Sequence, residues 1–286
     1  MSARPPLDER AVALLACPVC GRPLGAQPDA SALRCAAGHA FDRARQGHVT
    51  LLPSGHRPPS GDSAAMVADR MAFLEAGHYA GITRALAGAV GADGPPRSLL
   101  DLGGGTGHHL ARVLDRAPDA VGVVLDSSPY AARRAARAHE RAVAVVGDSW
   151  ARLPVRDDAV DRVLVVFAPR NGPEIARVLK PDGRLVVVTP AGDHLGELVG
   201  PLGLLRVDPD KAARLAASLE PDLRPVRTTG HREQLVLPRA AAATLVGMGP
   251  HARHTTPAAV AAALARLPEP IPVTVSVDVT SYRRPG

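Results

Sequence analysis

Four residues near the start of the sequence have the types and spacing of a zinc site. Two residues separate Cys17 from Cys20, three separate Cys35 from His39, and fourteen lie between the two pairs. Zinc takes four tetrahedral sulfur or nitrogen ligands, and two short knuckles joined by a loop can supply them without a large core. Because protein groups fill all four positions, none is left for water, and the pattern predicts a structural zinc ion.

Two further histidines, His48 and His56, are close enough in sequence to compete for the fourth ligand position. His39 is favoured over them by its offset from Cys35. The chain has three cysteines in all, and an odd number argues against a disulfide framework. The alternative interpretation is three unrelated cysteines near a surface histidine.

A glycine-rich loop forms the second constellation. The segment Asp101-Leu-Gly-Gly-Gly-Thr-Gly107 follows an apolar run and places Gly103, Gly105 and Gly107 at alternate positions. Glycines let the backbone approach a ligand closely, and the N-terminus of a following helix favours negative charge. A dinucleotide fingerprint would need glycine where His108 stands, and a phosphate-binding loop would need Gly-Lys-Ser/Thr, which is absent.

Acidic residues end the next two predicted strands. Asp126 comes nineteen residues after Gly107 and is placed to accept both hydroxyls of a ribose, and Asp148 ends the third strand. Together with Asp101, this pattern resembles the class I S-adenosylmethionine-dependent methyltransferases, which implies contacts to the cofactor's amino-acid end, ribose and adenine. A nucleotide-binding dehydrogenase, or solvated loop carboxylates, are the alternatives.

Several longer stretches also have a recognisable pattern: Gly38-His-Ala-Phe-Asp42, Gly47-His-Val-Thr-Leu-Leu52, Gly61-Asp-Ser-Ala-Ala-Met66, Phe73-Leu-Glu-Ala-Gly-His-Tyr79, Phe167-Ala-Pro169, Glu174-Ile-Ala-Arg-Val-Leu-Lys-Pro-Asp-Gly183 and Thr189-Pro-Ala-Gly-Asp-His-Leu195. Together with the cysteine segment, these stretches resemble one family, the 23S rRNA (guanine-N1)-methyltransferases. The resemblance implies methyl transfer to N1 of a guanine in a hairpin of 23S rRNA. In one branch of the family this modification contributes to resistance against macrolides such as tylosin. The resemblance also implies a homodimer.

The family's cofactor pocket adds three residues to those found by spacing. The implied cofactor-binding set is Tyr79, Asp101, Gly103, Gly105, Thr106, Gly107, Asp126, Asp148 and His194. Without the resemblance, Tyr79 would be a packing residue at a helix end and His194 a surface histidine. The chain departs from many relatives at Thr106, where they carry an acid, and at His108 and His109, where they carry aromatic residues.

The catalytic residues remain unknown from sequence. N1 of guanine carries a proton at neutral pH, so the enzyme must align N1 with the methyl group, accept that proton and stabilise charge on O6. Arg170 stands where many relatives have a cysteine and Asn171 follows it, and both are candidates to face O6. No general base can be assigned, although His108 and His194 have suitable chemistry.

Alternating apolar runs and helical patterns must position these residues. Strands are predicted at 98–101, 120–125, 142–146, 160–167, 184–189, 234–237 and 271–280, and helices at 63–74, 82–90, 129–141 and 173–179. Such alternation favours an α/β fold of the Rossmann-like, class I methyltransferase type with a mostly parallel seven-stranded sheet. The predicted organisation is a zinc-ribbon-like RNA-binding module at 1–50, a linker at 51–62 and a methyltransferase domain at 63–286.

Composition and net charge indicate which kinds of partner the protein can bind. The formal net charge is +6, which favours an acidic partner such as RNA, although the chain holds only two lysines and its arginines also fit the codon bias of a GC-rich genome. No apolar run could span a membrane and no export signal is recognised, so a cytoplasmic protein is expected. Three groups of residues are candidates for RNA contact: Arg133, Arg134, Arg137 and Arg141; Arg43, Arg45 and Arg57; and His251, Arg253 and His254.

Two rival functions stay open at this point. One is a small-molecule methyltransferase that keeps the zinc module for folding or dimerisation. The other is an RNA-binding protein whose methyltransferase fold is inactive. The intact acids of the glycine loop and of the following strands argue against the second.

Overall fold

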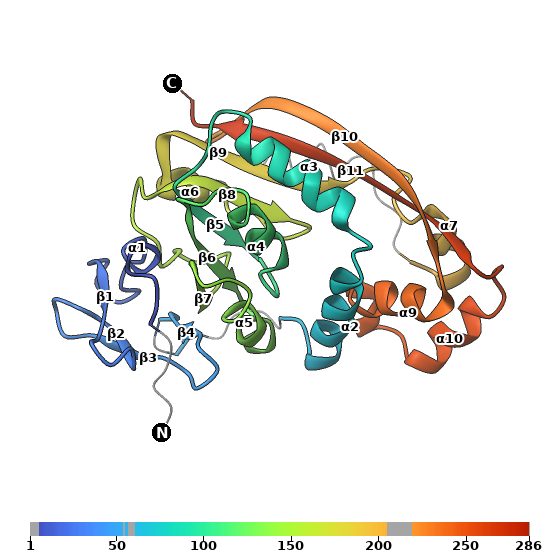
Figure 1. Cartoon of the computed structure of the whole chain (residues 1–286), viewed down its shortest axis with the longest axis horizontal. Coiled ribbons are helices and arrows are strands. Elements are labelled where there is room, and N and C mark those ends of the chain that lie inside the picture. Colours follow the sequence, from blue (N-terminus) through green and yellow to red (C-terminus); the bar gives the residue numbers. More distant parts are fainter. Residues whose placement is uncertain (1–5, 54, 57–60, 205–218, 286) are drawn as a thin grey trace.

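An eight-stranded sheet forms the centre of the molecule in this computed structural model, which describes residues 6–53, 55–56, 61–204 and 219–285 (Figure 1). The strand order is β10-β11-β9-β8-β5-β6-β7-β4, parallel from β9 to β4, with β11 antiparallel to β9 and β10 antiparallel to β11. The strands are β4 (Val49–Thr50), β5 (Ser98–Leu102), β6 (Val121–Asp126), β7 (Ala142–Val146), β8 (Val160–Val166), β9 (Leu179–Pro190), β10 (Arg224–Leu237) and β11 (Ile271–Arg283).

Helices cover both faces of this sheet, which confirms the predicted fold class. The helices are α1 (Glu9–Val12), α2 (Ala64–Glu75), α3 (Ala80–Gly91), α4 (His108–Leu114), α5 (Pro129–Ala135), α6 (Gly172–Val178), α7 (Gly196–Leu202), α9 (Arg239–Gly247) and α10 (Pro257–Leu264). Leu99 and Val124 pack in one core with α3 and α4, and Leu100 and Val123 pack in the other with α1 and α6. Successive strand residues point to opposite faces, so burial on both faces explains the nearly continuous apolar runs.

The amino-terminal segment is docked closely on this sheet. It forms its own three-stranded antiparallel sheet of β1 (Leu24–Ala26), β2 (Ala32–Cys35) and β3 (Ala40–Asp42). Leu15 forms a bridge with Val155, and α1 shares a core with the large sheet. Strand β4, parallel to β7, is the eighth strand of the large sheet and was not predicted, because two residues are too few to give a periodic pattern.

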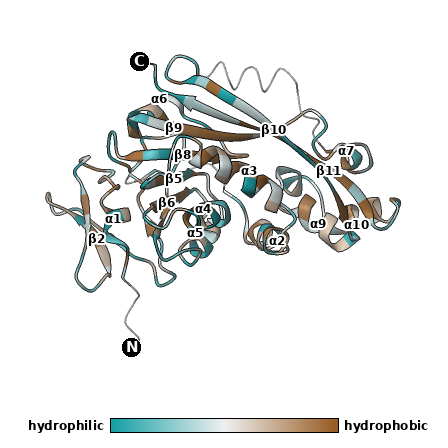
Figure 2. Cartoon of the chain, turned by 45° about the horizontal axis from the view of Figure 1, so that its top comes forward, coloured by the Kyte–Doolittle hydropathy of each residue, from teal (hydrophilic) through white to brown (hydrophobic). Residues whose placement is uncertain are grey.

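The carboxyl-terminal strands are longer than the sequence predicts. Figure 2 shows hydrophobic colour along β9 and hydrophilic stretches along the edge strand β10. Because most side chains of β10 are exposed, its first ten residues carry no apolar signal. A short 3-10 helix (Pro250–Arg253) lies between α9 and α10. Among the described helices, none combines the length and apolar character needed to cross a membrane.

One helix is shorter than predicted. The segment 129–141 is helical only to Ala135, and a turn then leads into β7. The guanidinium of Arg141 donates hydrogen bonds to the carbonyls of Leu114, Ala117 and Ala120 at 2.6–2.7 Å. Arg141 therefore stabilises the end of α4 and the loop into β6, and the prediction that it shares a cationic helix face is wrong.

Candidate cofactor and metal sites

The structure brings the four predicted zinc ligands together. One possible ligand atom from each of Cys17, Cys20, Cys35 and His39 lies within 4.8 Å of the others. Nδ1 of His39 is 3.6 Å from Sγ of Cys17 and 3.4 Å from Sγ of Cys35, and the Sγ atoms of Cys20 and Cys35 are 3.7 Å apart. Three thiols and an imidazole are a donor set that suits tetrahedral zinc, so the residues present fit the ion.

Local turns aim backbone groups at these sulfurs. Gly21 and Gly38 follow the two knuckles with φ of +71° and +87°, a conformation that other residues adopt at a cost. Burial raises the pKa of the Cys35 thiol, but the Ala37 backbone N–H and the His39 side chain outweigh it and bring the pKa to about 6. The thiolate, which is the form that binds metal, is thus favoured at this position before any ion arrives.

The two competing histidines lie elsewhere. His48 is buried, and its pKa is lowered by burial and by the charge of Arg133. His56 contacts the methyltransferase part of the chain, with Nε2 at 2.7 Å from Oδ2 of Asp148. Among the described residues, His39 is the histidine that completes the cysteine cluster.

The glycine loop crosses the carboxyl end of β5 and meets neighbouring groups at very short range. Gly103, Gly105 and Gly107 all have positive φ. A Cβ atom on Gly103 would lie 2.5 Å from Cβ of Ala168, and one on Gly104 would lie 2.6 Å from the carboxyl group of Asp101. The loop is therefore a tight backbone cradle that side chains would fill, as an adenosyl cofactor requires.

Asp101 and Asp126 support this cradle from two adjacent strands. Asp126 accepts hydrogen bonds from the backbone N–H groups of Gly105 at 2.9 Å and Ser128 at 2.8 Å, so it fixes the loop against the start of α5. Asp101 is 1% exposed, and neither of its carboxylate oxygens makes a well-formed hydrogen bond. Burial raises the pKa of Asp101 to about 7, and the charge of Asp126 adds to the rise. An orphaned, buried carboxyl group of this kind suits the cationic amino group of a ligand.

Asp148 lies at the end of the third parallel strand, as predicted. Its Oδ1 accepts a hydrogen bond from the backbone N–H of Trp150 at 2.9 Å, while Oδ2 contacts His56. The predicted linker thus reaches the cofactor edge of the sheet through His56, which sequence reasoning considered only as a zinc ligand. Its short spacing from the cysteines gave no indication of a contact 92 residues away along the chain.

Three rings form a row beside the cradle. Tyr79 is buried and its ring centroid lies 6.3 Å from that of Phe167, which in turn lies 5.7 Å from the ring of His194. His194 accepts the backbone N–H of Ser276 at Nδ1, and burial lowers its pKa to about 4. The imidazole is therefore neutral near pH 7, with its proton on Nε2, where it can serve as a donor to a ligand.

Phe167 is the residue of this row whose geometry the sequence did not reveal. It follows β8 with φ of +54°, an uncommon conformation for a residue with a bulky side chain, and it is 40% exposed. The backbone conformation turns a large apolar ring into solvent at the edge where the cofactor cradle lies. Positive φ at a non-glycine position has no sequence signal.

Arg70 and His109 also approach the cradle without having been predicted to do so. Cδ of Arg70 lies 3.6 Å from the position of a Cβ on Gly105, and its guanidinium donates to Asp62 at 2.6 Å and to the carbonyl of Met248 at 2.9 Å. Nδ1 of His109 is 2.9 Å from Oγ1 of Thr83, and burial lowers the pKa of this histidine to about 3. Thr106 itself is buried in the loop.

The two catalytic candidates have structural partners. Asn171 is the N-cap of α6, where its Oδ1 accepts the backbone N–H of Glu174 and its Nδ2 donates to the carbonyl of Trp150 at 3.1 Å. Arg170 is half-buried, burial lowers the pKa of its guanidinium, and Tyr282 of β11 is the group that opposes this shift. Neither arrangement brings a donor to the glycine loop.

Of the remaining RNA candidates, the structure separates surface groups from internal ones. Arg43 is 6% exposed and its Nε donates to the carbonyl of Gly47 at 3.0 Å, so the prediction of an exposed RNA contact there is wrong. Arg45 is exposed, and Arg57 lies outside the described residues. Arg253 is exposed and lies 3.8 Å from Asp62, with His254 exposed beside it and His251 half-buried.

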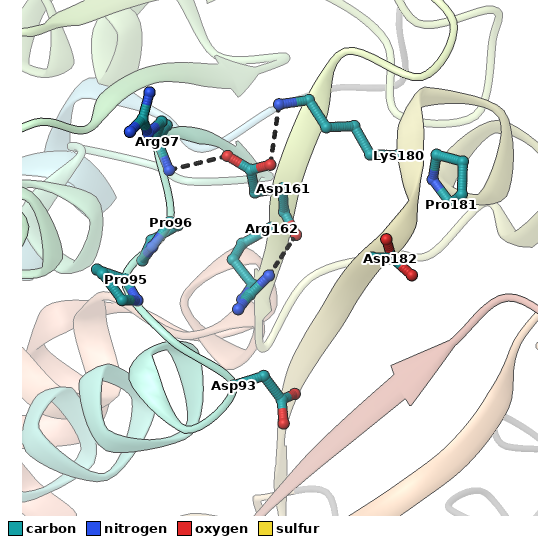
Figure 3. A pocket seen from close by; sticks show the side chains of 9 residues that line it. All are labelled: Asp93, Pro95, Pro96, Arg97, Asp161, Arg162, Lys180, Pro181 and Asp182. Carbon is teal, nitrogen blue, oxygen red and sulfur yellow. Dashed lines mark hydrogen bonds and ion pairs between the residues drawn. The ribbon is translucent and has the colours of Figure 1, made fainter.

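A hollow at the amino-terminal end of the parallel strands is lined by three acidic and three basic side chains. Figure 3 shows this hollow of about 450 Å³, where Asp161 accepts from Lys180 and from the backbone of Arg97. The Lys180 ammonium is 2.9 Å from Oδ1 of Asp161, and Arg184 pairs with Asp93 at 3.1 Å. Because its charges neutralise one another and it lies at the amino ends of β5 and β8, this hollow is structural.

Comparison with known proteins agrees with both sites. Residues 15–58 match the family model of the RlmA N-terminal zinc ribbon, and residues 99–183 match that of a methyltransferase domain. A protein of Micromonospora griseorubida, named as a 23S rRNA (guanine-N1)-methyltransferase, is 53% identical over 94% of this chain and 97% of its own. The chain belongs to this methyltransferase family. The 23S rRNA (guanine(748)-N1)-methyltransferase of Streptomyces fradiae is 49% identical over 97% of this chain and 99% of its own, and a relative in Bacillus subtilis is 32% identical over 64% and 66%.

Membership of this family identifies the cofactor of the glycine loop and the metal of the cysteine cluster. The methyltransferase is S-adenosylmethionine-dependent, and its Cys3His cluster is a zinc ribbon. The cradle at Gly103 and Gly104 and the orphaned carboxyl group of Asp101 fit the cofactor, and the thiol and imidazole donors fit zinc.

Proposed function

We propose that this methyltransferase transfers the methyl group of S-adenosylmethionine to N1 of a guanine in a hairpin of 23S rRNA. The observation that carries the proposal is that one chain holds both a zinc ribbon and a complete glycine cradle and is 49–53% identical, over nearly its full length, to relatives named for this reaction. A small-molecule methyltransferase would not need the exposed arginines of the zinc module, which are Arg22, Arg34 and Arg45.

The cofactor would be held along the carboxyl edge of the parallel strands. Asp101 would take the amino group, Asp126 the ribose hydroxyls and Asp148 the adenine side, with Tyr79 and His194 closing the pocket and Gly103, Gly105, Thr106 and Gly107 forming its floor. When bound, S-adenosylmethionine supplies an electrophilic methyl group. Positioning of the acceptor nitrogen against this group supplies much of the rate.

Phe167 would provide the platform for the target base. A guanine must leave its stack before its N1 can reach a buried pocket, and an exposed aromatic face compensates for the lost stacking. Phe167 presents such a face, within 5.7 Å of the His194 ring. The neutral imidazole of His194 would donate its Nε2–H to guanine O6 and stabilise the negative charge that develops there.

Primer extension on 23S rRNA tests the proposed reaction. After treatment with purified protein and S-adenosylmethionine, a methyl on N1 blocks the pairing edge of guanine and stops reverse transcriptase one nucleotide before it. The Streptomyces fradiae relative is named for guanine 748, so a stop next to that position is the expected result. Cofactor binding without any stop in 23S rRNA would reject the RNA substrate and favour a small-molecule acceptor.

Three further properties belong to the proposal. We expect a cytoplasmic enzyme, because its substrate is ribosomal RNA, and a homodimer, which the family resemblance supports and light scattering of the purified protein would test. We also expect a contribution to macrolide resistance of the tylosin type. Expression in a susceptible host should then raise the tylosin concentration needed to stop growth.

A further inference from the structure

A hollow of about 280 Å³ lies between the amino-terminal module, α2 and α5, on the lower side of the molecule in Figure 1. Gln46 of the amino-terminal module and Val67 of α2 form part of its wall, and Tyr130, Arg133, Arg134 and Arg137 line it from α5 and the turn that follows. We call this hollow the α5 groove. It is separate from the glycine cradle and from the zinc ligands.

The arginines of the α5 groove have no acidic partners. Arg133, Arg134 and Arg137 are all exposed, and within the described chain none of them forms an ion pair with a carboxylate. In the hollow of Figure 3, by contrast, three acidic side chains stand beside three basic ones, and Lys180 pairs with Asp161 at 2.9 Å. Three unpaired guanidinium groups around one concave surface attract a polyanion.

Tyr130 gives the groove a second property. Its side chain is 43% exposed in a chain with only seven aromatic residues of the Phe, Trp and Tyr types, and Cζ of Arg133 lies 5.7 Å from the centre of its ring. An exposed ring beside guanidinium planes is the combination on which unpaired bases stack while arginines hold the phosphates.

The walls of the groove are held firmly in place. The backbone turn at Gly47, next to Gln46, approaches α5 so closely that a Cβ there would lie 3.2 Å from Cβ of Ala136. At the other end, the hydroxyl of Ser128, the N-cap of α5, donates to the carbonyl of Asp62 at 2.6 Å. Because the N-cap Ser128 lies two residues after Asp126, Arg134 is only about 9 Å along the helix from this end of α5, which adjoins the cofactor edge.

We propose that the α5 groove binds a single-stranded segment of the substrate RNA next to the methylated hairpin, with phosphates on Arg134 and Arg137 and a base stacked on Tyr130. This inference rests on the proposed function. It assigns to the junction of the zinc module and α5 the task of gripping RNA that has left the helix. Of the four arginines predicted to form a cationic helix face, the α5 groove contains Arg133, Arg134 and Arg137, and Arg141 is not part of it.

The test compares three full-length variants in binding to a hairpin RNA with its single-stranded flanks. R134Q/R137Q should weaken binding at least tenfold and reduce the slope of log affinity against log salt by about 1.4, since each phosphate contact on a single strand contributes about 0.7. Y130L should weaken binding about 5- to 150-fold without changing that slope. R116Q removes an exposed arginine at the opposite edge of the sheet and should behave as the wild type.

Affinity for S-adenosylmethionine and zinc content serve as folding checks and should stay unchanged in all variants. The groove is rejected if R134Q/R137Q matches R116Q in affinity and salt slope while the wild type still binds and methylates the RNA. If the wild type itself neither binds nor methylates 23S rRNA, it is the proposed function that fails. A trimmed hairpin without flanks should bind all variants equally, and an undiminished difference on that RNA would overturn the single-stranded assignment.

Discussion

The zinc cluster and the cofactor cradle are built in opposite ways. The zinc ligands all come from residues 17–39 and meet through two glycine turns and a small antiparallel sheet. The residues proposed to bind the cofactor are spread from Tyr79 to His194, and they lie at one edge of the sheet because the parallel strands end there. The first site depends on a metal for its integrity, and the second depends on the packing of the large core.

This difference implies that the two sites should fail separately. A metal site without a large core loses its fold when the ion leaves. The hydrogen bonds that fix the cradle run from Gly105 and Ser128 to Asp126 and do not involve the zinc ligands. Because α1 shares a core with the sheet, point substitutions test this independence more cleanly than removal of residues 1–50 would.

The largest effect is expected from loss of a zinc ligand. In C35S, the cluster would lose a thiolate, and since structural zinc contributes about 10–16 kcal/mol of apparent binding energy, the module should unfold locally. We expect zinc to be absent by mass spectrometry and RNA methylation to fall by more than about 100-fold.

Cofactor affinity should survive in C35S within about threefold, as measured by calorimetry. V19A is the matched control, since Val19 lies between the first two cysteines and is 55% exposed. A simultaneous loss of cofactor binding in C35S would show that the two sites are coupled.

The reverse effect is expected from filling the cradle. In G104V, the new Cβ would fall 2.6 Å from the Asp101 carboxyl group and 2.9 Å from Cγ1 of Val124. Overpacking of about 1–3 kcal/mol should displace the loop and weaken cofactor binding about 5- to 150-fold, with zinc content unchanged.

G88A provides the comparison for this substitution. Gly88 lies in α3 with no atom within 4 Å of a Cβ position, so alanine there should leave cofactor affinity unchanged and raise stability slightly. Wild-type affinity in G104V would mean that the loop does not hold the cofactor.

The same contrast decides how much could be read from the sequence. The zinc site could be predicted in full because its ligands are local, and the parallel sheet could be predicted because buried strands are apolar and alternate with helices. The positions of Asp126 and Asp148 at the edge of the sheet could be predicted because a predicted strand ends at each of them. The His56 contact with Asp148 and the approach of Arg70 to Gly105 could not be predicted, since they join distant segments through side-chain packing. Strand β4 was too short, and β10 too exposed, to show the alternation of apolar and polar residues that predicts a strand.

A smaller effect is expected from pH, acting on the cradle and not on the zinc site. Burial raises the pKa of Asp101 to about 7, so the carboxyl group is mostly protonated at pH 6 and half ionised at pH 7. A cationic amino group binds the ionised form. Cofactor affinity should therefore rise about fivefold from pH 6 to pH 7, by calorimetry, while the cofactor's own amino group stays mainly charged.

D101N removes this titration and should flatten most of that rise. Burial also raises the pKa of Asp126, so any slope that persists in D101N measures the second carboxyl group. An unaltered slope in D101N would place the cofactor's amino group away from Asp101.

An effect of similar size is expected at the proposed base platform, and it should change neither zinc content nor cofactor affinity. In F167L, an apolar side chain without a ring replaces the exposed ring of Phe167, and leucine can adopt its positive φ as well as phenylalanine can. Losing an aromatic face costs about 0.5–1.5 kcal/mol in addition to the loss of buried apolar area. We therefore expect kcat/KM for RNA methylation to fall about 2- to 12-fold. Cofactor affinity should remain as in the wild type.

Two variants serve as controls for this substitution. F167Y keeps the ring and should be as active as the wild type. F41L removes a ring from β3 of the amino-terminal module and should leave kcat/KM unchanged. If F167L methylates as fast as the wild type, the target guanine stacks elsewhere, and the strained backbone at Phe167 serves only to pack the ring against Tyr79 and His194.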